Sequence, residues 1–393
     1  MLAACGAVAA TAGLLVGCPS LGGLTSAPDA GALDAAGPDV VDASPTEAAP
    51  SDATSTDTGN GSSCTHARWP GAPDAGSGSG DAGRFVLALQ TFNLDPTNPA
   101  EPIGLDLDDQ CTCPGPESCG AAMDSGITCD NADGRDPVFN RLLLQLAEIT
   151  PPIGPAGIQA VVTQGRANYL LRISSYNGLA DDAEVAVELF VSTGTTTDDA
   201  GAHVTPQFDG TDQWEVLSSS AIDTGSSTFV SVYFDLGAYV TNHVLVAHPA
   251  DAQGFVPTFD EYLGPGAGNG NPLILYLSDA VITGTLTPTS DGSFSLQNAF
   301  FGARIPTDGP LGGLAALTQV GLCSSSPLFA QIRAELCPAR DLATRAANDN
   351  TGASCAAISL GASFVATPAL LGPVVSRALV PSGCADASVP ACP

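Results

Sequence analysis

The segment from Ile103 to Asn140 constrains the fold more than any other part of the sequence, because it has too few apolar side chains to build a core of its own. It holds four cysteines among many acidic residues, and Arg135 is its one base. A segment of this kind is ordered by covalent cross-links or by bound ions. We therefore expect a disulfide-stapled, acid-lined loop that leads into a short helix and lies against a β-rich body.

The charge of the whole chain is strongly negative. The 393 residues carry a formal net charge of −30, and all 11 basic side chains are arginines. So acidic a protein is repelled by nucleic acid and by anionic lipid surfaces. We therefore expect no nucleic-acid partner, and contact with a membrane through a lipid anchor only.

Cysteine usage indicates an exported protein. The chain has 12 cysteines, many for a cytosolic protein of this size, and those beyond residue 18 form an even set. In an oxidising compartment such a set predicts disulfide bridges, although the spacing does not determine their connectivity. Zinc is disfavoured, because Cys-x-Cys followed by two long gaps is a poor zinc pattern. The predicted disulfide cysteines are Cys64, Cys111, Cys113, Cys119, Cys129, Cys323, Cys337, Cys355, Cys384 and Cys392.

The amino terminus has the pattern of a lipoprotein signal peptide. Residues 1–17 are apolar or small, and the tetrapeptide Leu15-Val16-Gly17-Cys18 resembles the bacterial lipobox. We expect lipidation of Cys18; an ordinary secretory signal with an incidental cysteine is the alternative. Pro19 stands where inner-membrane lipoproteins carry a retention aspartate, which favours the outer membrane or the cell surface.

Residues 18–83 have the composition of a disordered tether. They are rich in Ala, Asp, Pro, Ser, Thr and Gly, and Trp69 is their only large aromatic residue. Such a segment buries too little apolar area to offset the entropy that is lost on ordering. We expect an acidic spacer between the lipid and the body, with Cys64 tying its end to the body.

Residues 84–393 predict a single, mainly β domain. Strand-like runs alternate with turn clusters such as Asn177-Gly178, which favours an antiparallel β-sandwich or jelly-roll. Helical spacing predicts a short helix over 137–149 and a small disulfide-stapled helical cap over about 306–350. Residues 353–376 carry no charge, but their glycines and prolines favour a buried strand and loop over a membrane helix. The expected strands include 85–94, 185–192, 294–297, 300–305 and 358–366. Cys384 and Cys392 are close enough in sequence to close a short loop.

Two groups of oxygen-bearing side chains are candidate calcium sites. Ca²⁺ takes six to eight oxygen ligands, and clustered carboxylates repel one another unless a cation lies between them. The first group flanks the four cysteines and consists of Asp106, Asp108, Asp109, Asp130, Asp133 and Asp136. The second is Asn177, Asp181 and Asp182. The alternatives are a solvated acidic loop for the first group and capping of a strand for the second.

The sequence contains no recognisable catalytic pattern. It lacks the GxSxG nucleophile elbow and the HExxH metal motif. Glu184 and Glu188 would share one face of a strand, like the paired glutamates of concanavalin-like glycan hydrolases. The aspartate that those enzymes place between the glutamates is absent, so two outward-pointing acids on an edge strand are the simpler interpretation.

Four short motifs of the body are informative in combination: residues 104–108 (GLDLD), Cys129-Asp130, residues 176–182, and residues 355–361 (CAAISLG). In combination they resemble uncharacterised cell-surface lipoproteins of myxobacterial type. The resemblance covers most of residues 84–375 and leaves out the tether. It implies export and one long domain, and that group has no known activity to carry over.

The expected function is that of an exported, lipid-anchored envelope lipoprotein with a structural or binding role and no catalytic activity. Its partner would be a surface glycan or another envelope protein. A glycan hydrolase built on Glu184 and Glu188 is one alternative. A calcium-dependent glycan-binding module is the other, and it requires exposed rings from among Tyr169, Trp214, Tyr233, Tyr262 and Tyr276.

Overall fold

Alternating apolar residues at the start of the body form β1 (Phe85–Asn93), close to the strand expected over 85–94. The computed structural model describes residues 65–74, 82–112, 118–119, 128–131, 133–149, 154–199, 201–223, 229–249, 253–255, 274–290, 292–308, 311, 323–376 and 391–392. These residues belong to one compact unit, Thr56–Pro393. The expected signal peptide (1–17), Cys18 and the expected tether as far as Cys64 lie outside the described residues.

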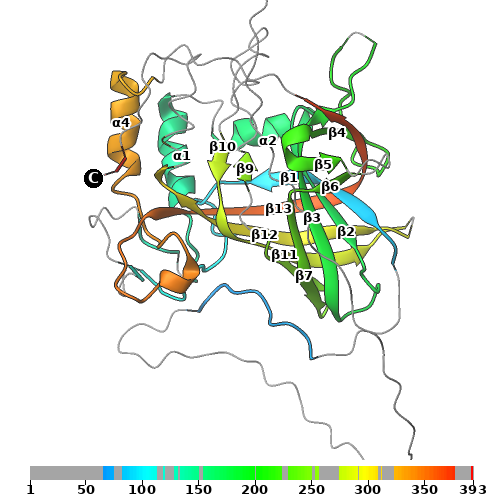
Figure 1. The fold of residues 1–393 in the computed structure, drawn as a ribbon, viewed down its shortest axis with the longest axis horizontal. Coiled ribbons are helices and arrows are strands. Elements are labelled where there is room, and N and C mark those ends of the chain that lie inside the picture. The colour runs from blue at the N-terminus through cyan, green and yellow to red at the C-terminus, as the bar shows by residue number, and fades with distance from the viewer. Residues whose placement is uncertain are drawn as a thin grey trace, which may run out of the picture. The chain divides into compact units, whose positions relative to one another are not determined.

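Strands dominate the described part of the chain (Figure 1), which confirms the mainly β prediction. The predicted strands 294–297 and 300–305 are one strand, whose pairing with its neighbour shifts register between Thr283 and Thr285. After β1 the strands are β2 (Asn168–Ser174), β3 (Asp182–Thr195), β4 (Gln213–Leu217), β5 (Ala221–Asp223), β6 (Phe229–Ser231), β7 (Tyr233–Thr241), β8 (Val244–Ala247), β9 (Gln253–Phe255), β10 (Ile274–Tyr276), β11 (Ser278–Pro288), β12 (Phe294–Pro306) and β13 (Ala357–Val375).

The large sheet closes on itself. Its strands follow the order β1-β2-β3-β4-β13-β12-β11-β8-β7, and two further pairings join β1 to β13 and β3 to β7. Eight strands thereby form a closed antiparallel barrel, while β4 pairs antiparallel with β3 and parallel with β13. The antiparallel prediction is confirmed, but the sheet is closed where a two-layer sandwich or jelly-roll was expected. Closure is possible because β3 and β13 are long enough, at 14 and 19 residues, to pair with several partners each.

Apolar side chains fill the inside of the barrel. On β1 and β2, Leu87, Leu89, Leu171 and Ile173 belong to one continuous core, and every second residue along these strands has the same orientation. The opposite face carries a second, smaller cluster around the fully buried Trp214 of β4. Both faces of this part of the sheet are therefore covered.

The uncharged segment 353–376 consists mostly of β13. This strand pairs first with β12, then with β1 and finally with β4. Pro368, which lacks a backbone N–H, lies opposite Leu87 within the β1 pairing. The membrane-helix interpretation of this segment is therefore wrong, and the expected strand over 358–366 is confirmed in a longer form.

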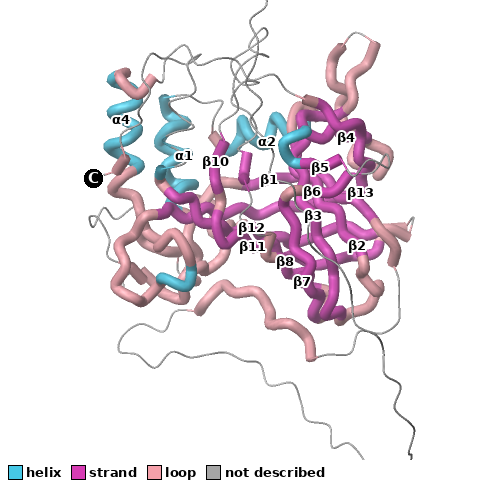
Figure 2. Tube along the Cα trace, in the orientation of Figure 1, coloured by secondary structure: helices cyan, strands magenta, loops and turns pink. Residues whose placement is uncertain are grey.

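Helices in the described part of the chain pack against the main core, and Figure 2 shows α1 (Val138–Ile149) and α4 (Pro327–Leu336) beside the strands. α1 matches the predicted helix, and α4 lies within the predicted cap, where Ser326 Oγ caps it by accepting from the Phe329 N–H at 3.1 Å. α2 (Pro155–Thr163) was not expected, and two short 3₁₀ turns are η2 (Ser218–Ser220) and η5 (Ala346–Asn348). None of the described helices combines the length and apolar character that crossing a membrane requires.

Two disulfide bridges have both partners in the described residues. Cys119 is bonded to Cys355 across a sequence separation of 236, and Cys337 is bonded to Cys392 across a separation of 55. The short loop expected between Cys384 and Cys392 is therefore wrong, because the chain folds Cys392 back to the end of α4. Cys111, Cys129 and Cys323 are also in disulfides, and Cys64, Cys113 and Cys384 lie outside the described residues.

Residues 65–74, near the end of the expected tether, lie along the body. The Ala67 N–H donates to the Asp133 carbonyl at 2.9 Å, and the Ala67 carbonyl accepts from the Asp106 N–H at 3.1 Å. The Trp69 ring meets the His248 ring edge-on, with centroids 5.5 Å apart. This segment therefore reaches the acidic loop directly.

Candidate metal centre

Two glycines bring the acidic loop against the barrel. Gly104 has a φ of 74°, and a Cβ at that position would lie 2.9 Å from the Cα of Gly361 in β13. Gly134 has a φ of 73°, and its Cβ would lie 2.8 Å from Asp106 Oδ2. Only glycine adopts such conformations freely at so close an approach. The backbone therefore makes room for the Asp106 carboxylate next to β13.

Three aspartates converge at this point. One carboxylate oxygen each of Asp106, Asp108 and Asp136 lies within 4.8 Å of the other two. The three residues are 0%, 5% and 1% exposed, respectively. Asp106 and Asp108 come from the loop after β1, whereas Asp136 lies two residues before the start of α1. This arrangement brings together half of the first predicted calcium group.

Backbone N–H groups orient these carboxylates. Asp136 Oδ2 accepts from the Leu107 N–H at 2.7 Å, and Asp106 Oδ1 accepts from the Asp109 N–H at 2.8 Å. Asp108 Oδ1 accepts from the Gln110 N–H at 2.9 Å. Asp106 Oδ2 also contacts His66 Nδ1. A carboxylate that is fixed through one oxygen is oriented while retaining capacity to bind a cation, which is how preorganised metal ligands are held.

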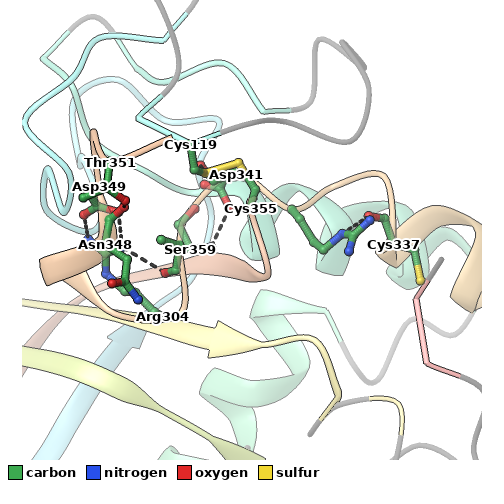
Figure 3. Close-up of a disulfide and its surroundings, with 11 residues drawn as sticks. Cys119, Arg304, Cys337, Asp341, Asn348, Asp349, Thr351, Cys355 and Ser359 are labelled. Atoms are coloured by element: carbon green, nitrogen blue, oxygen red, sulfur yellow. Dashed lines mark hydrogen bonds and ion pairs between the residues drawn. A yellow bond between two sulfur atoms is a disulfide. The ribbon is translucent and has the colours of Figure 1, made fainter. Parts of the chain in front are cut away.

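Two further aspartates extend the cluster. Asp130 Oδ2 accepts from the Thr112 N–H at 2.6 Å, and its side chain is also hydrogen-bonded to Asp136. Asp341 lies between α4 and η5, and its Oδ1 accepts from the N–H of Ser359 in β13 at 2.9 Å (Figure 3). The other oxygen of Asp341, Oδ2, is buried and has no hydrogen-bond partner in the described structure. We call these five residues, Asp106, Asp108, Asp130, Asp136 and Asp341, the acid cluster.

Burial raises the pKa values of four members of the acid cluster, because a charged carboxylate loses its hydration there; the four are Asp106, Asp130, Asp136 and Asp341. The pKa rises to about 6 for Asp106, about 7 for Asp341 and about 8 for Asp130. The pKa of Asp136 is held well above its ordinary value by burial and by the charges of its aspartate neighbours. The negative charge of Asp108 adds to the burial effect at all four.

Two arginines, Arg141 and Arg304, lie close to the acid cluster. The Arg141 guanidinium acts electrostatically on Asp130, Asp136 and Asp341, and it donates to the Cys129 carbonyl. Arg304 of β12 is fully buried, donates to the Leu107 carbonyl at 2.6 Å and forms a two-point ion pair with Asp349 (Figure 3). Arg304 is therefore largely committed to Asp349, and the acid cluster keeps more negative than positive groups.

The remaining members of the first predicted calcium group lie elsewhere. Asp109 is half exposed and pairs with Arg68, and it joins the acid cluster only through a second set of possible ligands, His66, Asp106 and Asp109. Asp133 pairs with Arg135, with Nε and Oδ2 2.7 Å apart. Of the six predicted residues, Asp106, Asp108, Asp130 and Asp136 therefore lie together, whereas Asp109 and Asp133 form separate ion pairs.

The second predicted calcium group forms a turn. Asp182 Oδ2 accepts from the Asn177 N–H at 2.7 Å, and its Oδ1 accepts from the Glu184 N–H at 3.1 Å. Asp181 Oδ1 accepts from the Asn242 N–H at 2.8 Å, and Asn177 Oδ1 accepts from the Leu179 N–H at 2.7 Å. Among the described residues, Asp181 and Asp182 do not belong to a set of three acidic, histidine or cysteine side chains that could hold a metal ion. The carboxylates of this group accept hydrogen bonds from backbone N–H groups, which agrees with the alternative interpretation that they cap a strand.

The paired glutamates differ in environment. Glu188 binds Arg172 through both oxygens, at 2.6 and 2.5 Å, and also accepts from the Ser231 N–H at 3.0 Å. Glu184 is exposed. Strand β3 pairs on both sides, so the expected edge strand is wrong. Of the aromatic residues that glycan binding requires, Trp214 and Tyr233 are buried, Tyr169 is half-buried, Tyr276 is 49% exposed and Tyr262 lies outside the described residues.

Sequence reasoning missed Asp341 and His66. Asp341 is more than 200 positions from Asp136, and no local pattern connects them; the disulfide between Cys119 and Cys355 brings their segments together. His66 stands in the expected tether, where its neighbours predict no structure. Comparison of the chain with protein-family models, curated proteins and solved structures finds no match.

Proposed function

We propose that the protein is an exported, lipid-anchored envelope protein with a structural or binding role, and that the acid cluster holds a calcium ion that completes its fold. The observation that carries the calcium proposal is the convergence of Asp106, Asp108 and Asp136, whose oxygens lie within 4.8 Å of one another in a buried site. The lipobox, the acidic spacer and the disulfides support export and anchoring.

The charge balance of the acid cluster favours a divalent cation. Several buried carboxylates so close together repel one another, and they are stable when they are protonated or when a cation lies between them. At neutral pH their raised pKa values allow partial protonation, and a bound cation removes the need for it. The unpartnered Oδ2 of Asp341 is one more oxygen that a cation would satisfy.

Calcium fits the donor set better than other common cations. All the donors are oxygens, which excludes a preference for zinc or copper. Ca²⁺ accepts six to eight protein oxygens in variable geometry, whereas Mg²⁺ keeps several of its waters and requires a near-ideal octahedron. Five aspartates from three separate segments suit the larger and more flexible ion.

Thermal unfolding of the metal-stripped full chain, with and without calcium, tests the proposal. Calcium at about 100 times its dissociation constant stabilises the folded state by about 2.7 kcal/mol, which corresponds to a rise in Tm of about 5 °C. Asp136→Asn should remove this rise, because it deletes a ligand charge and keeps the shape of the side chain. Asp133→Asn, the same substitution in the same loop but outside the acid cluster, should retain it.

The melting temperature of the metal-free Asp136→Asn variant gives a second test, in which the expected change has the opposite sign. Without calcium, Asp136→Asn should melt at a temperature equal to or above that of the unaltered protein, because one repelling carboxylate has become neutral. The calcium proposal is wrong if calcium leaves the Tm of the unaltered protein unchanged, or if Asp133→Asn and Asp136→Asn lose the calcium response equally.

A further inference from the structure

A cleft of about 460 Å³ is formed where residues 65–74 lie against the barrel. Trp69 of this segment and His248, which follows β8, line it together, and their rings meet edge-on with centroids 5.5 Å apart. β11, β12, η5 and the acidic loop contribute further side chains, but the five aspartates of the acid cluster do not line the cleft. Sites for small molecules commonly measure about 300–1,000 Å³, so this cleft has the size of a ligand site.

The backbone of β11 is irregular where it borders the cleft. Its pairing with β12 shifts register between Ser278 and Val281, and Asp279, which lies between them, has a φ of 46°. Residues other than glycine rarely adopt this left-handed conformation, and such strain is concentrated at ligand sites. A bulge in a strand changes the direction of a side chain. Here the Asp279 carboxylate lines the cleft, and its Oδ2 is oriented by accepting from the Ala346 N–H at 2.5 Å.

The charged groups of the cleft neutralise one another. Arg345 Nη1 lies 3.6 Å from Asp279 Oδ1, and Arg304 is bound to Asp349 and to backbone carbonyls. Burial lowers the pKa of His248, so its imidazole is neutral at physiological pH. The formal net charge of −30 repels anions from the surface of the whole chain. A neutral ligand is therefore favoured over an anion such as a nucleotide.

The accessible polar groups of the cleft suit a ligand with several hydroxyl groups. Asp279 is 31% exposed and accepts hydrogen bonds, Arg345 is 48% exposed and donates them, and the exposed, neutral His248 does one of each. The Trp69 ring adds a flat apolar surface, against which the C–H face of a sugar ring can pack. A cavity of about 150 Å³ holds one benzene. A hexose has about twice as many non-hydrogen atoms as benzene, so it fits the cleft.

We propose that this cleft binds one neutral sugar unit of a glycan, with the sugar ring against Trp69 and its hydroxyl groups hydrogen-bonded to Asp279 and Arg345. This inference rests on the binding role proposed above, to which it gives a site and a class of ligand. It uses none of the aspartates of the acid cluster. Sugar binding and the calcium response of the Tm are measured separately, so failure of the one is distinguishable from failure of the other.

Tryptophan fluorescence of the full chain, in the presence of calcium, tests this inference. The chain has two tryptophans, and Trp214 is fully buried, so a change on adding sugar reports on Trp69. The probes are the methyl glycosides of glucose, galactose, mannose and N-acetylglucosamine, with glucuronate as the charged counterpart. We expect saturable binding of at least one glycoside with a dissociation constant of about 1 mM, in keeping with the binding efficiency of small ligands. Glucuronate should bind at least tenfold more weakly.

Variants of the cleft locate the site. Asp279→Asn should weaken binding of the glycoside about tenfold, because it removes the charged acceptor, and asparagine tolerates the same left-handed backbone. Trp69→Ala should weaken it at least tenfold, and isothermal titration measures this because the variant loses its optical signal. The matched control is Phe234→Ala, at an exposed ring of β7 that does not line the cleft, and it should bind like the unaltered protein.

Cooperative melting of each variant shows whether it is folded. The inference is overturned if none of the four glycosides binds at ten times the expected dissociation constant, or if a folded Trp69→Ala variant binds at full strength. If Trp69→Ala fails to fold, Asp279→Asn decides the matter, since undiminished binding without the carboxylate contradicts the proposed contact. Equal binding of glucuronate overturns the requirement for a neutral ligand.

Discussion

At the level of single residues, three buried aspartates of the acid cluster have two features in common, a hydrogen bond from the backbone and a raised pKa. Asp106, Asp130 and Asp136 each accept from a backbone N–H, and all three have raised pKa values because burial disfavours their charged forms. Fixed orientation combined with unfavourable ionisation is unusual for carboxylates with a purely structural role, which are normally paired with a base. A fixed orientation together with a raised pKa is expected of carboxylates that bind a cation.

These pKa values predict how stability depends on pH. In the unfolded chain the carboxyls titrate near 3.8, whereas the folded values are about 6 for Asp106, about 7 for Asp341 and about 8 for Asp130. Between about pH 4 and pH 8 the folded state therefore binds more protons than the unfolded state, and the free energy of unfolding falls as pH rises. For metal-free protein, we expect the Tm to be lower at about pH 8 than at about pH 5.

Calcium should weaken or reverse that dependence, because it binds the deprotonated carboxylates. Calorimetric melts at both pH values, with and without calcium, measure the effect. A metal-free Tm that rises steadily from about pH 5 to about pH 8 contradicts the raised pKa values of the cluster.

Glu188 permits a test of the hydrolase alternative at a single residue. Its side chain is 13% exposed and that of Arg172 is 7% exposed, and the Arg172 guanidinium stacks 4.9 Å from the centroid of the Phe190 ring. Removing one partner of so buried a pair leaves an uncompensated charge, so Glu188→Ala should destabilise the fold by about 3 kcal/mol. Urea unfolding measures this cost. Glu184→Ala, at an exposed position, should change stability by less than about 0.5 kcal/mol.

The result distinguishes a structural from a catalytic Glu188. A small stability cost, together with release of reducing sugar by the unaltered protein that Glu188→Gln abolishes, would favour the hydrolase. A large cost without sugar release places Glu188 in the framework of the barrel.

At the level of elements, the bridge between Cys119 and Cys355 joins the acidic loop to the segment that carries Asp341. Arg304 makes a parallel, non-covalent link, because it binds the Leu107 carbonyl on one side and the Ala343 carbonyl at 3.0 Å on the other. Asn140 of α1 fixes the same region to β13 through two hydrogen bonds with Gly361, at 2.7 and 3.0 Å. The acid cluster is thus held by three independent connections between segments that are distant in the sequence.

Removal of this disulfide should affect both stability and calcium affinity. In the chain-entropy model a bridge across 236 residues stabilises the folded state by about 5 kcal/mol, and the other two connections should reduce the observed loss. Cys119→Ala combined with Cys355→Ala should also weaken calcium binding, because Asp341 is no longer held beside the other ligands. The matched control is Cys337→Ala with Cys392→Ala, which should lower stability and leave calcium affinity close to that of the unaltered protein. Equal calcium affinity in both double variants argues against Asp341 as a ligand.

The predictability of the elements follows from how local their signals are. The strand around Leu87 and Leu89 and the helix around Phe139 were predicted, because alternation and helical spacing are properties of neighbouring residues. α2 was missed, since Pro155 and Gly157 stand in its first turn. Barrel closure was missed because alternation along β3 says nothing about which strands it pairs with. Asp106 and Asp136 were predicted because they are close in the sequence, whereas Asp341 was not, because only long-range pairing brings it to them.

At the level of the whole molecule, a closed barrel is a rigid body with no open edge at its ring strands. Closure satisfies the backbone groups that an edge strand would expose, which prevents the barrel strands from pairing with other chains. Residues 65–74 are docked on the body: the Tyr239 hydroxyl donates to the Pro70 carbonyl at 2.6 Å, and His66 contacts Asp106. In the proposed arrangement the anchor and the cation site are thereby connected through one short segment.

The proposed anchor leads to a prediction for the intact cell. Cys18→Ser should abolish acylation, because serine has no thiol to carry the lipid, and the protein should move from the membrane fraction to the soluble fraction of the envelope. Intact mass of the native and variant proteins measures the acyl chains, and fractionation measures the release. The body of the released variant should keep its calcium-dependent rise in Tm, since residues 65–376 contain all five aspartates of the acid cluster. A native protein whose mass shows no acyl chain on Cys18, or a variant that stays with the membrane, contradicts anchoring by lipid and leaves the calcium proposal standing on its own.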